Sequence, residues 1–499
     1  MTWVITASFW KNCKVSAGAL WWASSTDVVG KPAKLIAGGG MEPMDWKELI
    51  PLLVTFITIA IIMGGVLGGV AYLTLLERKI SAWVQDRHGP NRVGFDFGQS
   101  WLWFLRRFWG LGQPLADGVK FLLKEDVIPG HVDRLFYLVA PMVAMGTALF
   151  AMAVVSVGDA PALPSLTVQS QLRPGVDVEA LVFPATVAEA TRMDQGGGLA
   201  HFKMQHEEYD SRWKFAISPG VDIGFLFIFA VGSLAVYGIV LGGWSSNNKF
   251  SLLGSLRASA QMISYEIPMG LSVLGVLILV GSLNLERIID WQSRNGWLAL
   301  YQPTALLLFL TAIFAECNRL PFDLAECEQE LVGGYHTEYS AMKFAMFFLG
   351  EYTHMITTSF LTVALFLGGW HLPWLEAVLG QDGWFALVAK LVIFSLKMLC
   401  IIFLFMMVRW TILRFKFNQL MNLAWKAMMP LGVLGLLGAM VVGQYGLSPW
   451  LLLPWSVFIL VLITALGSLV PYEDPKVRFR VLSGRSPSAS GVVGGSAGP

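Results

Sequence analysis

The stretch ECNRLPFDLAECEQELVGGYHTEYSAMKFAMFFLGE, residues 316–351, lies between two apolar runs that are each long enough to cross a bilayer. It contains seven carboxylates, opposed by Arg319 and Lys343. Glu316 and Glu351 stand at the edges of the flanking apolar runs rather than in the open loop. Carboxylates at membrane depth are costly and usually mark proton pathways, ion pathways or ligand sites. The stretch therefore predicts a membrane protein with a functional acidic segment, and an ordinary solvated loop is the simpler alternative.

The composition of the whole chain indicates a polytopic membrane protein. Of its 499 residues, 55% are hydrophobic and 14% are charged, whereas soluble domains carry roughly 25% charged residues. The net charge of +1 gives no bulk attraction to nucleic acid. The four cysteines, Cys13, Cys317, Cys327 and Cys400, fit neither a zinc nor an iron–sulfur spacing, so we expect reduced thiols and no metal site.

Nine apolar runs are long enough to span a membrane, at about 20 residues per crossing. They cover residues 52–76, 137–157, 222–243, 267–285, 297–315, 352–370, 384–408, 427–447 and 450–470. Lys and Arg gather in loops on one side, above all in residues 78–134. The positive-inside rule therefore predicts that this loop, the acidic segment and the C-terminus are cytoplasmic and that the N-terminus is outside. We expect an all-α fold, a bundle of about nine transmembrane helices with amphipathic helices on the cytoplasmic side.

The membrane domain is expected to have a less ordered extension at each end. A long polar loop, residues 158–220, falls on the outer side within it. The alternative for the first 40 residues is a start placed too early, with Met41 or Met44 as the true first residue. The predicted parts are an N-terminal extension with little structure, 1–44, the membrane domain, 45–475, and a flexible cytoplasmic tail rich in Ser and Gly, 476–499.

One cytoplasmic segment, residues 77–125, has the pattern of helices rather than of a loop. Pro114 can begin a helix, and the apolar residues after it form a stripe at helical spacing. Asp117 and Lys120 are three apart on this helix, and Arg78 lies where the first span leaves the membrane. These charges could line the mouth of a pocket for the head group of an amphiphile. Basic residues could equally anchor the helix at the bilayer interface, and composition does not separate the two.

Several charged residues are predicted to lie inside the membrane domain. Glu266, Glu316 and Glu351 each stand where a predicted span meets the cytoplasmic side, so they should share one depth. Carboxylates close together in low dielectric cannot all ionise, so their protonation should be coupled. Lys397 lies deep in the seventh span, where a lone cation is expensive, and is expected to face a carboxylate.

Four stretches of the chain resemble one family. They are ERKISAWVQDRHGPNRVG (77–94), QPLADGVKFLLKED (113–126), GWSSNNKFSLLGSLRASAQMISYE (243–266) and NRLPFDLAECEQELVGGYHTEYS (318–340). In these stretches the sequence is similar to the H-type subunit of the proton-pumping NADH:quinone oxidoreductase, respiratory complex I, the counterpart of mitochondrial subunit one. The resemblance covers about residues 45–470, apart from the outer loop.

The resemblance implies a role in an enzyme complex. A subunit of this kind helps to form the chamber that binds quinone, the substrate, and couples quinone reduction to proton pumping. It implies partners in the hydrophilic arm, which carry the flavin and the iron–sulfur clusters, and small membrane-arm subunits. It implies no NADH, flavin or cluster site in this chain, no nucleic acid, and a place in the lipid bilayer of a bacterial inner membrane.

The resemblance also implies roles for particular residues, carried over by position. Those of the quinone chamber would be Arg78, Asp117, Lys120, Glu326, Glu328 and Glu330. Those of proton coupling would be Glu266, Glu316, Glu351, Asp323 and Lys397. One departure is Ser233 in AVGSLAVYG, where some members of the family have a carboxylate in the third span.

Two other functions remain open on the residues alone. A secondary transporter could use the same carboxylates for a coupling ion, but we find no internal repeat, and the acids lie towards one face rather than at the midplane. The second is the homologous subunit of a membrane-bound hydrogenase, which the family resemblance excludes less firmly. The GPNRVG and ELVGGYHTEYS stretches fit the quinone enzyme better.

Overall fold

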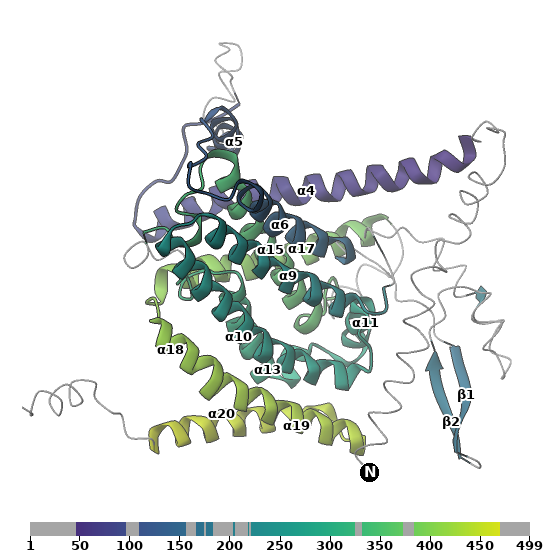
Figure 1. Cartoon of the computed structure of the whole chain (residues 1–499). Helices are drawn as coiled ribbons and strands as arrows, with labels where there is room; N and C mark the ends of the chain where they lie inside the picture. Colours follow the sequence, from purple (N-terminus) through teal and green to yellow (C-terminus); the bar gives the residue numbers. More distant parts are fainter. Residues whose placement is uncertain are drawn as a thin grey trace, which may run out of the picture.

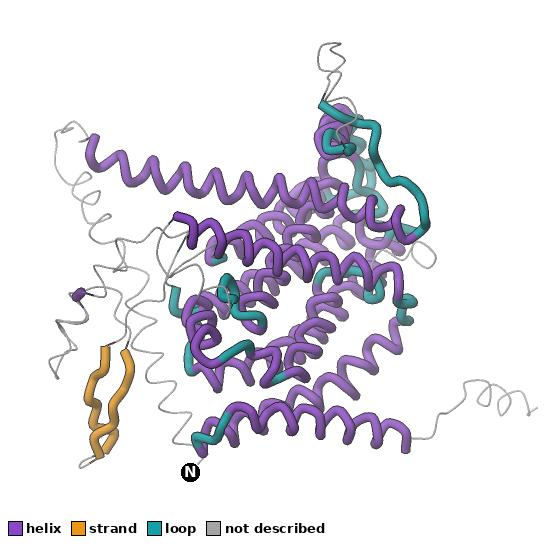
Figure 2. Tube along the Cα trace, turned by 180° about the vertical axis from the view of Figure 1, so that it is seen from behind, coloured by secondary structure: helices purple, strands orange, loops and turns teal. Residues whose placement is uncertain are grey.

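A computed structural model of the chain forms a helical bundle, with one short β-hairpin outside it (Figures 1 and 2). It describes residues 46–95, 109–155, 166–173, 176–182, 203–204, 218, 221–324, 332–372 and 384–469. The predicted N-terminal extension, the predicted C-terminal tail and most of the predicted outer loop lie outside these residues.

Each of the nine predicted spans coincides with a helix, which confirms the helical membrane bundle. Six helical stretches of the described part are long and apolar enough to cross a membrane, and α13 and α20 are shorter apolar helices. The remaining span is α15, which is 26 residues long and carries several threonines. The helices that correspond to the nine spans are α4 (Trp46–Val84), α6 (Arg134–Ala151), α9 (Gly224–Ser245), α10 (Lys249–Val280), α13 (Pro303–Glu316), α15 (Ala341–Phe366), α17 (Trp384–Thr411), α19 (Met429–Tyr445) and α20 (Leu452–Leu469).

Shorter elements connect these helices. The antiparallel hairpin β1–β2 lies within the predicted outer loop and was not predicted. The others are the amphipathic helix α5 (Gln113–Leu123), the helices α11 (Leu285–Asn295), α12 (Leu298–Tyr301) and α18 (Phe417–Asn422), the π-helix η5 (Leu423–Met428), and the 3-10 turns η3 (Met152–Val154), η4 (Gly334–His336) and η6 (Pro449–Leu451). The strands are β1 (Leu166–Arg173) and β2 (Val176–Val182).

Side-chain caps fix where several helices begin. Asp133, Asn248 and Asn284 each stand just before a helix and accept a hydrogen bond from a backbone N–H of its first turn, at 3.2, 3.0 and 2.9 Å. Such a cap satisfies an N–H group that has no partner inside the helix. At the other end of α10, Gly281 adopts a φ of 73°, the left-handed conformation that commonly ends a helix.

Helix ends from distant parts of the sequence meet at two opposite ends of the bundle. At one end the backbone N–H of Asp133 donates to the carbonyl of Ser245, so that α6 begins where α9 ends. At the other end Phe225 donates to Leu283, so that α9 begins where α10 ends. We call the first the α5 end, because α5 lies there beside the C-terminal end of α4 (Figure 1).

Close packing in the bundle depends on small residues. A Cβ added to Gly238 of α9 would lie 2.8 Å from the backbone nitrogen of Ala144 in α6. Small residues at helix interfaces let backbones approach closely in membranes. Small residues also precede Glu266, and α10 runs unbroken through them from Lys249, so the helix begins before the predicted span of residues 267–285.

Candidate functional site

A cavity of about 800 Å³ lies at the α5 end, between α4, α5, α15 and α17. Its wall is mostly apolar, with a few polar side chains, as in pockets that bind small molecules. It extends along α4 from Gly68, at membrane depth, to Ser81 near the end of the helix. A long apolar ligand with one polar end would match this lining.

Helix α5 forms one wall of the pocket and is held there by backbone contacts. As predicted, Pro114 stands at its beginning, directly after Gln113, and the helix carries apolar residues at helical spacing, of which Leu115, Val119 and Leu122 line the pocket. The preceding loop packs so tightly that a Cβ on Gly110, whose φ is 75°, would collide with the carbonyl of Pro90. The GPNRVG turn therefore sets the position of α5.

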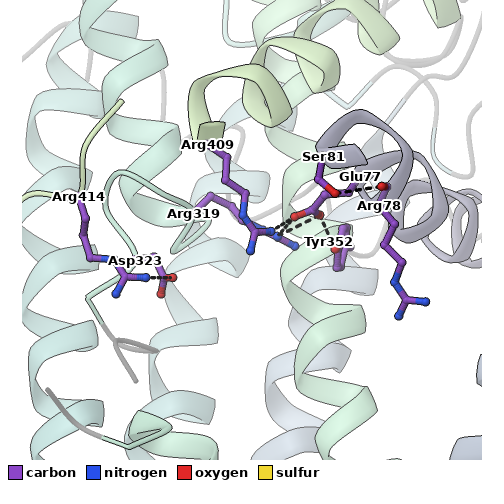
Figure 3. A network of polar contacts seen from close by, with 8 residues as sticks. All are labelled: Glu77, Arg78, Ser81, Arg319, Asp323, Tyr352, Arg409 and Arg414. Atoms are coloured by element: carbon purple, nitrogen blue, oxygen red, sulfur yellow. Dashed lines mark hydrogen bonds and ion pairs between the residues drawn. The ribbon is translucent and has the colours of Figure 1, made fainter. Parts of the chain in front are cut away.

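A buried charge cluster lies in the pocket wall, shown in Figure 3. The carboxylate of Glu77 in α4 accepts from Arg319 at 3.2 Å and from the hydroxyl of Tyr352 at 2.5 Å, and pairs with Arg409 of α17. The side chains of Glu77 and Arg319 are only 9% and 12% exposed. The Arg319 guanidinium also stacks on the Tyr352 ring, at 4.1 Å. One carboxylate thus holds two guanidinium groups from distant parts of the chain.

The predicted chamber residues Arg78 and Asp117 meet at the same pocket. Arg78 donates to Asp117 at 2.8 Å, which ties α4 to α5. Their side chains are 53% and 23% exposed, and the Arg78 side chain points away from Glu77 (Figure 3). Lys120, on the exposed face of α5, is not among the residues that line the pocket.

The acidic segment is described only in part. Asp323 is buried and accepts from Arg414 at 3.1 Å, apart from the Glu77 cluster (Figure 3). Glu326, Glu328 and Glu330 lie outside the described residues.

Three of the four carboxylates predicted for proton coupling, Glu266, Glu316 and Glu351, lie on three helices and are each half-buried. Glu316 ends α13, and its Oε1 lies 3.3 Å from where a Cβ on Gly232 of α9 would stand. Glu351 of α15 accepts from the hydroxyl of Tyr335 at 2.8 Å. The hydroxyl of Ser233 in α9 donates to the Ala230 carbonyl at 2.9 Å.

Lys397, which was predicted to face a carboxylate, also has backbone carbonyls as partners. Its ammonium group donates to the backbone carbonyls of Leu367, Gly369 and His371 at 2.7, 2.9 and 2.7 Å, just beyond the end of α15. It also lies 5.0 Å from the centre of the Trp297 ring. These contacts hold the C-terminal end of α15 against α17.

Sequence reasoning missed Glu77, Tyr352 and Arg409. The signal for Glu77 was present, because an acidic residue at the edge of an apolar run had singled out Glu316 and Glu351. Tyr352 and Arg409 had no such signal, because their role arises from three helices that meet only in the fold.

The fold and the site define a class: a multi-pass helical membrane protein with an amphiphilic pocket at one end and carboxylates inside its bundle. The family described as NADH dehydrogenase matches residues 57–192 and 204–440. Three similar proteins are each named as the H-type subunit of NADH-quinone oxidoreductase or as a numbered copy of it.

Those relatives are similar over nearly their whole length. The protein of Leptospira biflexa is 41% identical over 410 residues, 82% of this chain and 99% of its own. That of Cytophaga hutchinsonii is 40% identical over 366 residues, 73% and 90% of the two chains. That of Thermomicrobium roseum is 39% identical over 402 residues, 79% and 96%. The chain belongs to the family of H-type subunits of the NADH-quinone oxidoreductase complex, as its sequence motifs predicted.

Proposed function

We propose that this chain forms the membrane-embedded wall of a quinone-binding chamber and couples quinone reduction to proton translocation. The observation that carries the proposal is the pocket of about 800 Å³ beside the Glu77 cluster. Quinone is the substrate, and flavin and iron–sulfur clusters belong to partner subunits of the hydrophilic arm.

The lining of the pocket supports a quinone. The apolar residues of α4, α5 and α15 suit an isoprenoid tail, while Tyr352 and Arg409 bring polar groups to the wall where a head group could lie. A quinone that gains two electrons must take up protons or leave charge behind. A fixed cluster with two guanidinium groups would stabilise that negative charge, since preorganised donors act strongly where water is scarce.

The carboxylates support the coupling part of the proposal. Glu266, Glu316 and Glu351 lie on helices of the same bundle that holds the pocket. Tyr352, whose hydroxyl donates to Glu77, follows Glu351 directly on α15. A charge that appears in the pocket would therefore change the energy of protons on nearby carboxylates. The proposal also assigns Asp323 and Lys397 to proton coupling. It assigns Lys120, Glu326, Glu328 and Glu330 to the quinone chamber.

The proposed setting follows from the charge pattern and the family. The α5 end would face the cytoplasm and the hydrophilic arm, the N-terminus would be outside, and the membrane would be the bacterial inner membrane. Small membrane-arm subunits would pack against the remaining helices.

The test fills the pocket without touching its charges. A Cβ on Gly68, which lines the pocket, would meet nothing within 4 Å, so Gly68→Leu projects its side chain into open space. Gly64, one turn earlier on α4, is equally free of neighbours but is not among the lining residues, so Gly64→Leu is a matched control.

In assembled complex we expect Gly68→Leu to lower quinone reduction by roughly tenfold, because one misfitted group in an apolar pocket is worth about 1–3 kcal/mol. NADH oxidation with a water-soluble electron acceptor should persist, and Gly64→Leu should behave like the parent. Normal quinone kinetics in Gly68→Leu, with assembly verified on native gels, would refute the chamber.

A further inference from the structure

The segment that follows the undescribed part of the acidic loop, residues 332–340, is anchored to two helices. The carbonyl of Tyr335 accepts from Ser251 of α10 at 2.9 Å, and Asn248 donates to Glu338 at 2.7 Å. Tyr137 of α6 donates to the Glu338 carbonyl, also at 2.7 Å. We call this segment the loop anchor.

Backbone packing and ring stacking make the loop anchor stiff. A Cβ on Gly254 of α10 would lie 2.7 Å from the Cα of Gly334, so the two backbones are in direct apposition. The rings of Tyr137 and Tyr339 stack at 4.2 Å, with 6° between their planes. The Tyr339 hydroxyl donates to the carbonyl of Tyr137 at 3.2 Å.

One side chain of the loop anchor reaches a coupling carboxylate. Tyr335 is 1% exposed, its ring packs against Phe347 of α15 at 5.3 Å, and its hydroxyl donates to Glu351 at 2.8 Å. A hydrogen bond to an ionised group is shorter and roughly twice as strong as a neutral one. The orientation of the Glu351 carboxyl is therefore set by where the loop anchor stands.

We propose that Tyr335 is a positioning residue that orients the carboxyl group of Glu351 for proton transfer. The loop anchor holds the Tyr335 ring in place, so its hydroxyl fixes one oxygen of Glu351 and changes how firmly that carboxyl group holds its proton. Tyr335 itself neither gains nor loses a proton. This inference rests on the proposed coupling role of Glu351.

The test compares three variants in the intact complex reconstituted into vesicles. Tyr335→Phe removes the hydroxyl and keeps the ring that packs on Phe347. Tyr339→Phe is the matched control, because it removes a hydroxyl from the same loop anchor that bonds to Tyr137 and Ser245 rather than to Glu351. Glu351→Gln is the reference for complete loss of the carboxyl group.

Two readouts separate positioning from general loosening. The first is the number of protons translocated per electron, which we expect to fall by roughly two- to tenfold in Tyr335→Phe, given the net strength of a typical hydrogen bond. The second is the infrared band of the Glu351 carboxyl, identified by its absence in Glu351→Gln, which should shift in Tyr335→Phe and not in Tyr339→Phe.

The outcomes distinguish this inference from the proposed function. Full proton translocation in Glu351→Gln would overturn the coupling role of Glu351 and the inference with it. The inference alone would be overturned if Glu351→Gln lost proton translocation while Tyr335→Phe kept the parental number of protons per electron and an unshifted infrared band of the Glu351 carboxyl. Equal losses in Tyr335→Phe and Tyr339→Phe would also overturn it, because they would reflect a loosened loop anchor.

Discussion

Replacing Glu77 by Gln should both destabilise the membrane domain and slow quinone reduction. The substitution keeps the shape of the side chain, removes the charge that Arg319 and Arg409 share, and replaces one of the two accepting oxygens with an NH2 group that can only donate. Asp117→Asn is the matched control: it neutralises another carboxylate of the pocket wall, whose partner Arg78 is half-exposed.

The burial of the two pairs sets the expected difference. Opposite charges 3.2 Å apart, the Glu77–Arg319 distance, attract by roughly 5 kcal/mol at an effective dielectric of about 20. Removing one partner of a buried pair costs about 3–5 kcal/mol, because the other charge stays buried without it. An exposed pair such as Arg78–Asp117 is worth about 1 kcal/mol or less.

The assay is the temperature at which half of the purified complex still reduces quinone after a fixed heating time. We expect a clear drop for Glu77→Gln and a small one for Asp117→Asn, and a lower quinone-reduction rate before heating for Glu77→Gln. Equal heat resistance of the two variants would refute the argument that the cluster is buried and fixed.

Two further predictions follow from single side chains. Lys397→Met removes three bonds to carbonyls beyond α15, so amide exchange around Gly369 should rise by roughly tenfold or more; unchanged exchange would contradict the anchoring role. Burial lowers the pKa of His336 in the loop anchor from 6.5 to about 4. The unfolded chain therefore binds more protons in this range, and stability should fall as the pH drops from about 6.5 to about 4. His336→Gln should lessen that fall in a melting series across pH, and an unaltered slope would count against it.

The sequence predicts the helices well because long apolar runs have few other folds available in a bilayer. It also identifies Arg78 and Asp117 as charges that could line the mouth of one pocket, and the two form an ion pair in the structure. The start of α10 could not be read from the predicted span. Hydropathy marks where a helix becomes apolar, not where it begins, and α10 begins at Lys249 in a stretch of small polar residues.

The buried contacts of the site could not be derived from the sequence. Glu77 is paired with Arg319, 242 residues away, and with Arg409 on a third helix. Lys397 was predicted to face a carboxylate, and three backbone carbonyls just beyond the end of α15, where partial negative charge gathers, also accept hydrogen bonds from it. Spacing along the chain cannot foresee such partners, because they depend on where helices end in space.

The most direct test of the chamber is photochemical labelling of the intact, active complex with a quinone that carries a photoreactive group on its ring, followed by mapping of the labelled peptides. The account predicts labels in this chain on α4 around Glu77, on α5 and on the first turns of α15 near Tyr352, suppressed by excess unlabelled quinone. The chamber would be contradicted if the labels that excess unlabelled quinone suppresses lay, in this chain, only on helices away from the pocket, such as α19 and α20.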